Sequence, residues 1–167
     1  MLRSLRAIEG AIDAVLQRIA FAGIVALVAV MSLQIVSRVL FTATSWTEET
    51  ARYLLIWLTF LGACLAYHRG RHIAVTVLAD ALPPHGRRIC QGLIALVTIA
   101  FMSVLLQVGL DYMALQSFQQ SAALRIPMSV VYAVMPLSAA IMAYMALIDL
   151  LEAVSGLPGD TSGGRHP

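Results

Sequence analysis

Charged residues are scarce in this sequence, and lysine is absent. Only 12% of the 167 residues are charged, whereas a soluble domain usually carries about 25%. All eleven basic residues are arginine, and they are scattered along the chain with no patch of interleaved aromatics, which argues against a nucleic-acid-binding surface. The composition therefore excludes an ordinary soluble domain, and we expect no nucleic acid among the partners.

Cysteines are few, and the common catalytic motifs are missing. Cys64 and Cys90 lie in or beside apolar segments and form no CxxC pair, so we interpret them as buried free thiols rather than as a disulfide. The sequence contains no P-loop, GxSxG, HExxH or dinucleotide-binding fingerprint. No two histidines lie on different apolar segments, as a buried haem requires. We therefore predict that this chain is not an enzyme and holds no catalytic residue, metal or cofactor.

What the sequence has instead is four long apolar segments without Asp, Glu, Lys or Arg. A bilayer core about 30 Å thick needs about 20 helical residues to cross it. Three segments reach that length alone, and the second is extended upstream by polar residues 47–52, which suit the headgroup region. We predict an all-α integral membrane protein with a single domain over residues 1–154. The predicted transmembrane helices are about residues 19–40, 47–68, 89–111 and 128–150.

Two shorter segments are predicted to form interfacial amphipathic helices. Leu2–Ile19 has apolar residues at helical spacing, with charged and polar residues between them, and is expected to lie on the cytoplasmic surface. Ile73–Leu82 is apolar, too short to cross the bilayer, and followed by two prolines. The polar residues 155–167 are predicted to be a disordered cytoplasmic tail.

The arginine distribution predicts the orientation in the membrane. The N-terminal segment, the second loop and the tail together hold eight of the eleven arginines, and the first and third loops hold three. Cytoplasmic loops carry an excess of arginine and lysine. We therefore expect both termini in the cytoplasm and the first and third loops outside.

The densest polar cluster flanks the first exterior loop. Its members are Arg38, Trp46, Glu48, Glu49 and Arg52. Ser45 and Glu48 match a helix capping box, and Glu48 and Arg52 have the favourable i, i+4 order for an ion pair. Because charges near hydrocarbon are costly unless they are paired, we predict an Arg38–Glu49 ion pair that sets the angle between the first two spans. A structural or partner-interface role is favoured for the whole cluster.

Glycine and proline positions predict details of packing. Gly62 and Ala66 have the small-xxx-small spacing that permits close approach of helices. Pro127 suits the first turn of the fourth span. Pro136 lies inside that span and predicts a kink one turn earlier.

Isolated polar side chains carry weaker signals. His68 and His72 share a helix face, but flanking arginines disfavour a metal ion, so we predict interfacial hydrogen bonding where the second span ends. Gln34, Gln107 and Asp111 are the polar groups within or at the ends of the spans. Hydrogen bonding between helices is favoured over an ion pathway for these three.

The four-span plan and several short runs resemble the small membrane subunit (DctQ-type) of TRAP, or tripartite ATP-independent periplasmic, transporters. The resemblance covers about residues 10–152. The matching runs are Trp46–Tyr53, Phe60–Ala63, Gly70–Ile73 and Ala123–Met128, followed by Tyr132 and Pro136.

This resemblance implies a sodium-coupled secondary importer of organic acids in the bacterial inner membrane. A periplasmic solute-binding protein captures the cargo, and a large DctM-type membrane subunit carries the transport path and the sodium ions. The small, non-catalytic subunit enlarges the fixed scaffold within the lipid bilayer and helps to dock the binding protein. Residues of the matching runs then join the polar cluster as structural or partner-interface residues. They are Gly62, His72, Arg125, Pro127 and Pro136.

The residues alone leave two other functions open. One is a membrane anchor for a redox complex, against which the scattered histidines argue. The other is a small self-assembling channel or exporter.

Overall fold

The structure is a computed structural model that describes residues 2–40, 45–79 and 84–155, with side chains for residues 6–40, 45–70, 86 and 88–155. These ranges are helical except for a loop at residues 119–127 and a break at Ala133. The elements are α1 (Leu2–Leu40), α2 (Ser45–Ala79), α3 (Pro84–Leu115), the 3₁₀ helix η1 (Gln116–Phe118), α4 (Met128–Tyr132) and α5 (Val134–Ser155).

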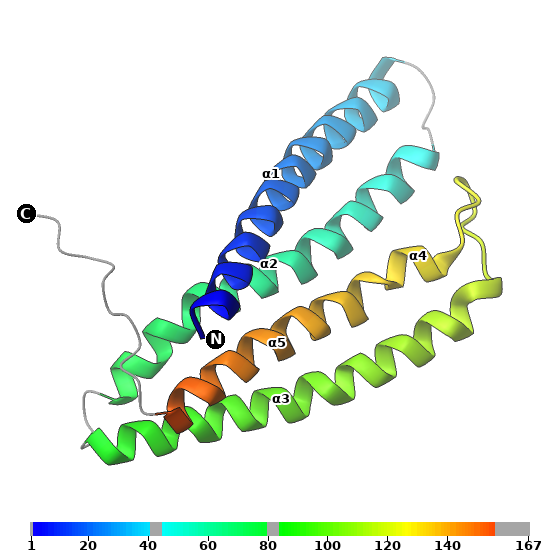
Figure 1. The fold of residues 1–167 in the computed structure, drawn as a ribbon. Helices are drawn as coiled ribbons and strands as arrows, with labels where there is room; N and C mark the ends of the chain where they lie inside the picture. The colour runs from blue at the N-terminus through cyan, green and yellow to red at the C-terminus, as the bar shows by residue number, and fades with distance from the viewer. Residues whose placement is uncertain (1, 41–44, 80–83, 156–167) are drawn as a thin grey trace, which may run out of the picture.

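Four helical segments are long and apolar enough to cross a membrane, which confirms the predicted fold class. Helix α1 packs on α2, α2 on α5, and α5 on α3, so that α1 and α3 lie at opposite edges (Figure 1). The start of α1 and the end of α5 lie at one end of the molecule, which we call the Glu152 end. We call the opposite end, where α2 begins and α3 ends, the Glu49 end. The four helical segments that can cross the membrane are Arg6–Leu40, Ser45–Gly70, Arg88–Phe118 and Met128–Ser155.

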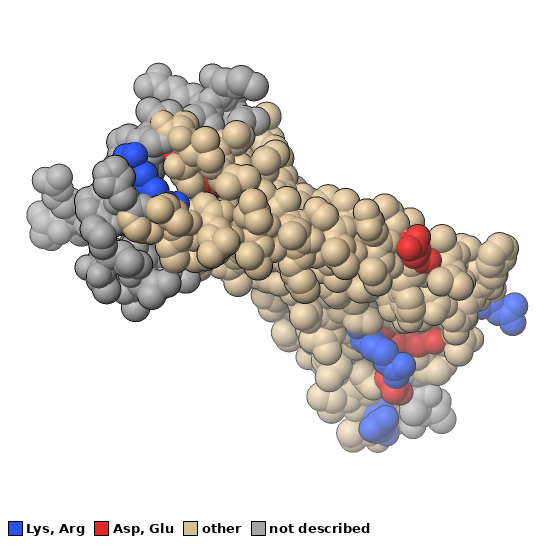
Figure 2. All heavy atoms as spheres, turned by 90° about the horizontal axis from the view of Figure 1, so that it is seen from below, with Lys and Arg blue, Asp and Glu red and all other residues tan. Residues whose placement is uncertain are grey.

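Charged side chains gather at the two ends of the molecule. Figure 2 shows Arg, Asp and Glu side chains near both ends, and the visible surface between them is formed by other residues. An uncharged band between two charged ends is the pattern that a bilayer requires, because charged side chains are costly in hydrocarbon. The surface is therefore consistent with four helices that cross a membrane.

A few side chains from the N-terminal half of α1 reach the buried core. Leu16 packs with Leu61 and Cys64, which are 4% and 0% exposed, and side chains from α5 close the cluster. Further along α1, Ala20 is also buried. Part of the apolar stripe at the start of the chain, including Ile12 and Leu16, thus packs against other helices of this protein.

Two segments predicted as separate surface helices prolong the transmembrane helices instead. Residues 2–19 form the first half of an unbroken α1, and residues 73–79 extend α2. An amphipathic stripe has the same spacing whether it packs on a membrane surface or on another helix, so the sequence did not distinguish these cases. Residues 80–82 and 156–167, including the predicted tail after Ser155, lie outside the described residues.

Two glycines lie where helices approach each other closely. A Cβ atom on Gly109 of α3 would lie 3.1 Å from Cδ and 3.2 Å from the backbone nitrogen of Pro136. A Cβ atom on Gly23 of α1 would lie 2.8 Å from a methyl carbon of Leu58. Small residues permit such contacts, which replace the hydrophobic effect as the source of packing between helices in lipid. Gly62 does not serve this purpose among the described residues, because a Cβ atom there would meet none of their atoms within 4 Å.

The predicted kink in the fourth span is confirmed. The helix is interrupted at Ala133, three residues before Pro136, and this break separates α4 from α5. Proline has no N–H group and its ring crowds the carbonyl one turn earlier. Pro127 takes the N-cap position of α4, immediately before the first turn in which it was predicted.

Replacement of Gly109 by Leu should destabilise the protein. The new side chain would meet the backbone of Pro136 and force α3 away from α5, at a cost of about 1–3 kcal/mol. Thermal unfolding of the purified chain in detergent measures the effect. Gly62→Leu is the matched control, and equal melting temperatures for the two variants would contradict the close approach at Gly109.

Candidate functional site

The loop between α3 and α4 has a defined backbone structure. The Ser121 N–H donates to the Ile126 carbonyl at 2.9 Å, and the Met128 N–H donates to the Gln119 carbonyl at 2.8 Å. Gln120 and Pro127 form an isolated antiparallel bridge. Arg125 has φ of 53°, a left-handed conformation that costs a residue with a side chain about 1–2 kcal/mol. The remaining contacts of the loop must offset that cost.

Glu49 of α2 supplies those contacts. Its carboxylate accepts three backbone hydrogen bonds, from Ala122 N–H at 2.9 Å, Ala123 N–H at 3.1 Å and Leu124 N–H at 3.0 Å. Successive N–H groups in a turn form a concavity that binds an anion, and hydrogen bonds to a charged acceptor are stronger than neutral ones. Here the anion is a side chain of the same protein, so Glu49 ties the loop to the beginning of α2.

The predicted Arg38–Glu49 ion pair is wrong. Arg38 is exposed at the end of α1 and, among the described residues, makes no ion pair with Glu49. From the sequence, arginine was the expected partner for the Glu49 carboxylate. In the structure this carboxylate instead accepts hydrogen bonds from backbone N–H groups. Such a partner has no sequence signature, because nearly every residue carries an N–H group.

Two further predictions concern Glu48: its ion pair with Arg52 is confirmed, and its capping box with Ser45 is wrong. Arg52 Nη2 lies 3.3 Å from Glu48 Oε1, which confirms the i, i+4 pair, although both side chains are exposed and such pairs contribute little stability. Glu48 turns toward Arg52, and the reciprocal capping box with Ser45 is not formed, since α2 already includes Ser45 as a helical residue. Thr47, which sequence reasoning overlooked, is fully buried.

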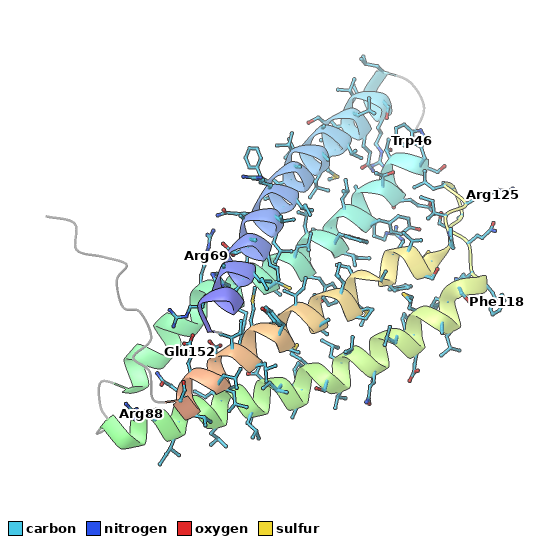
Figure 3. All side chains as sticks on the ribbon, in the orientation of Figure 1. Trp46, Arg69, Arg88, Phe118, Arg125 and Glu152 are labelled. Carbon is cyan, nitrogen blue, oxygen red and sulfur yellow. The ribbon has the colours of Figure 1, made fainter. Side chains whose placement is uncertain are left out.

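The loop and the start of α2 present a mixed polar and aromatic surface. Phe118 is 94% exposed and Trp46 is 44% exposed. Both lie with Arg125 at the Glu49 end (Figure 3). An open depression lies beside this surface. It is lined by Ser45, Glu48, Glu49, Arg52, Ala122 and Ala123.

A second polar cluster lies at the Glu152 end and was missed by sequence reasoning. Arg6 of α1 donates from Nη2 and Nε to Glu152 Oε1 of α5, at 2.7 and 2.8 Å. The Tyr67 hydroxyl of α2 donates to Asp149 Oδ2 of α5 at 3.4 Å. These contacts join α5 to the beginning of the chain and to α2.

His68 belongs to this second cluster. Its Nδ1 lies 3.2 Å from Oε1 of Glu9, whose side chain is 5% exposed. The expected end of the helix near His68 is wrong, because α2 continues to Ala79. The side chain of His72 lies outside the described residues. In the sequence, only the position of Glu9 along the apolar stripe of α1 could have indicated this contact. The same position fits an exposed surface residue equally well.

Substitution of Glu49 by Gln should release the loop. Glutamine keeps the shape of the side chain, but its amide group donates hydrogen bonds, so at least one of the three N–H groups loses its acceptor. We expect several-fold faster hydrogen–deuterium exchange at Ala122–Leu124. Glu48→Gln is the control on the neighbouring residue. Unchanged exchange in the Glu49 variant would refute the hydrogen bonds between Glu49 and the loop.

The Glu9–His68 contact should appear as an energetic coupling. Leucine at either position leaves the other polar group poorly satisfied in a buried site, whereas the double substitution removes both. A double-mutant cycle on unfolding in SDS should give a coupling of about 0.5–3 kcal/mol. Strict additivity of the two single substitutions would show that the contact has no energetic role.

Comparison with known proteins assigns the family. The sequence model of the family described as tripartite ATP-independent periplasmic transporters, DctQ component, matches residues 27–156. This range contains the C-terminal part of the first span and all of the other three. It also contains Glu49 and the loop that Glu49 holds.

Three relatives agree with this match. The isethionate TRAP transporter permease protein DctMQ of Oleidesulfovibrio alaskensis is 32% identical over 65% of this chain and 17% of its own length. The ectoine TRAP transporter small permease protein TeaB of Halomonas elongata is 35% identical over 55% of this chain and 49% of its own. The sialic acid TRAP transporter small permease protein SiaQ of Vibrio cholerae is 34% identical over 50% of this chain and 46% of its own.

The aligned regions thus span less than half the length of each relative. The family match nevertheless covers most of this chain, and the four spans agree with it. The chain therefore belongs to the DctQ family, the small permease subunits of TRAP transporters.

Proposed function

We propose that this chain is a non-catalytic scaffold subunit of a sodium-coupled TRAP importer. In this proposal it packs in the membrane beside a large DctM-type subunit, which carries the transport path and binds the sodium ions. Its Glu49 end offers a surface on which the periplasmic solute-binding protein docks. The chain itself binds neither cargo nor sodium.

The scaffold role is supported by the helices at the two edges. Apolar side chains of α1 and α3 remain largely exposed, including Phe21 at 71% and Phe101 at 61%. Such faces suit either lipid or the helices of another membrane protein. The relative DctMQ, which matches this chain over 17% of its own length, supports a DctM-type partner.

The observation that best supports the docking role is the set of hydrogen bonds between Glu49 and the loop. A loop held by three hydrogen bonds to α2 presents its exposed side chains in a fixed arrangement, which lowers the entropy cost of binding. Exposed aromatic and arginine side chains are the types that most often dominate the energy of protein interfaces. Phe118 and Arg125 are side chains of these types.

The orientation follows from the arginine count. Eight arginines on the side of both termini against three on the other support cytoplasmic termini in the bacterial inner membrane. The Glu49 end then faces the periplasm, where a binding protein operates. The names of the relatives include sialic acid and isethionate, and we propose an organic acid as the cargo of the complete transporter.

The docking role can be tested with Arg125→Gly. Glycine adopts the left-handed conformation without strain, so this variant removes the guanidinium group and preserves the loop. We expect the affinity of the binding protein for the complex of small and large subunits in nanodiscs to fall about fivefold or more, as for the loss of an important interface residue. The control is Arg69→Gln at the Glu152 end. Wild-type affinity in the Arg125 variant would contradict the docking role.

A further inference from the structure

Helix α3 has two exposed flanks of different chemistry in the half nearer the Glu49 end. One flank, which we call the polar flank, consists mainly of small and polar side chains and is bordered by the exposed Leu110. Its members are Ala100, Ser103, Gln107, Asp111 and Ala114, all exposed. The other flank, the apolar flank, consists of larger apolar side chains. Its members are Val97, Phe101, Val104, Val108 and Leu115, also exposed.

The two flanks are distinct because of the helical repeat. Residues 103, 107 and 111 are four apart, so each is displaced by only about 40° around the helix from the one before. The side of α3 that faces α4 and α5 carries buried Ala95, Met102 and Gly109. Since α3 lies at one edge of the molecule (Figure 1), no described helix of this chain covers either flank.

Part of the polar flank lies at the depth of the hydrocarbon. Arg88 marks the Glu152 end of this span, and a bilayer core about 30 Å thick corresponds to about 20 residues of helix. Counting about 1.5 Å per residue from Arg88, Gln107 falls just inside the far boundary of the core, and Asp111 falls about 5 Å beyond it, at the depth of the headgroups. Nearer to Arg88 the same side of α3 carries the apolar residues Ile89 and Leu93.

The polar groups on this flank differ in how they are satisfied. The Ser103 hydroxyl donates to the Ile99 carbonyl at 2.7 Å within the helix. The Gln107 amide and the Asp111 carboxylate have no hydrogen-bond partner among the described residues. Polar and ionisable groups at membrane depth usually face protein or a water-filled cavity rather than lipid. Small residues on either side leave room for another helix to approach.

We propose that the polar flank of α3 is covered by a transmembrane helix of the large membrane subunit, which supplies hydrogen-bond donors to Gln107 and Asp111. The apolar flank faces lipid. This inference rests on the proposed assembly with a large subunit and locates one of its contacts. A second copy of this chain is disfavoured as the occupant, because a two-fold symmetric contact through this flank would bring two Asp111 carboxylates together in a poorly solvated site.

Site-specific photo-cross-linking tests the assignment. A photoreactive amino acid is placed at Ser103 or Gln107 on the polar flank, and at Phe101 or Val108 on the apolar flank at similar depth. The chain is co-expressed with a DctM-type large subunit from the same bacterium, and the complex is purified through a tag on the large subunit. We expect cross-links to the large subunit from positions 103 and 107 and none from 101 and 108.

Substitutions provide a second measurement on the same complex. Gln107→Leu and Asp111→Leu should each weaken association of the two subunits in lipid vesicles about threefold, the effect of losing one average hydrogen bond between membrane helices. Phe101→Leu should leave association unchanged. The measurement is the transfer of fluorescence energy between labelled subunits.

The outcomes separate this inference from the proposed function. If the subunits co-purify but positions 103 and 107 cross-link to lipid alone or to a second copy of this chain, the assignment of the polar flank is overturned and the scaffold role stands. Equal cross-linking from both flanks also overturns the assignment. If the two subunits do not associate at all, both proposals fall.

Discussion

The carboxylate of Glu49 is the contact on which the arrangement of one whole end of this protein depends. It joins the first turn of α2 to a loop 73–75 residues later in the chain. The same loop connects α3 to α4 and contains a residue in a left-handed conformation. Without an anion to accept its N–H groups, the turn would have to satisfy them with water. The exposed side chains on either side of the turn would then have no fixed relation to α2.

The need for such ties follows from the membrane environment. Lipid is as apolar as the side chains between helices, so burial alone does not draw the helices together. The structure relies instead on close approach at Gly23, in the middle of α1, and at Gly109, toward the Glu49 end of α3, and on polar contacts at both ends. At the Glu152 end, Arg6–Glu152 and Glu9–His68 join α1 to α5 and to α2. Polar contacts at the two ends thus complement close packing at small residues between the helices.

Much of the fold was predictable because its signals are local. Apolar length identified the four spans, and Pro136 identified the break that separates α4 from α5, since a missing N–H group acts within one turn. The Glu48–Arg52 pair was also predictable from its spacing. The partners of Glu49 and Glu9 were not, because they lie far away in the sequence. In the first case the partner is backbone, and in the second it is a histidine whose neighbours favoured a different interpretation.

The sequence by itself determined that the chain crosses the membrane four times, where it bends, and which family it resembles. These properties depend on residue type and spacing along single helices. Only the tertiary structure decided which residues meet: that Glu49 holds a loop and not Arg38, that the first amphipathic segment packs against protein, and that one flank of α3 remains polar and uncovered. The physical reason is that hydrogen bonds and close packing depend on distances between helices, and a pattern along one helix does not contain those distances.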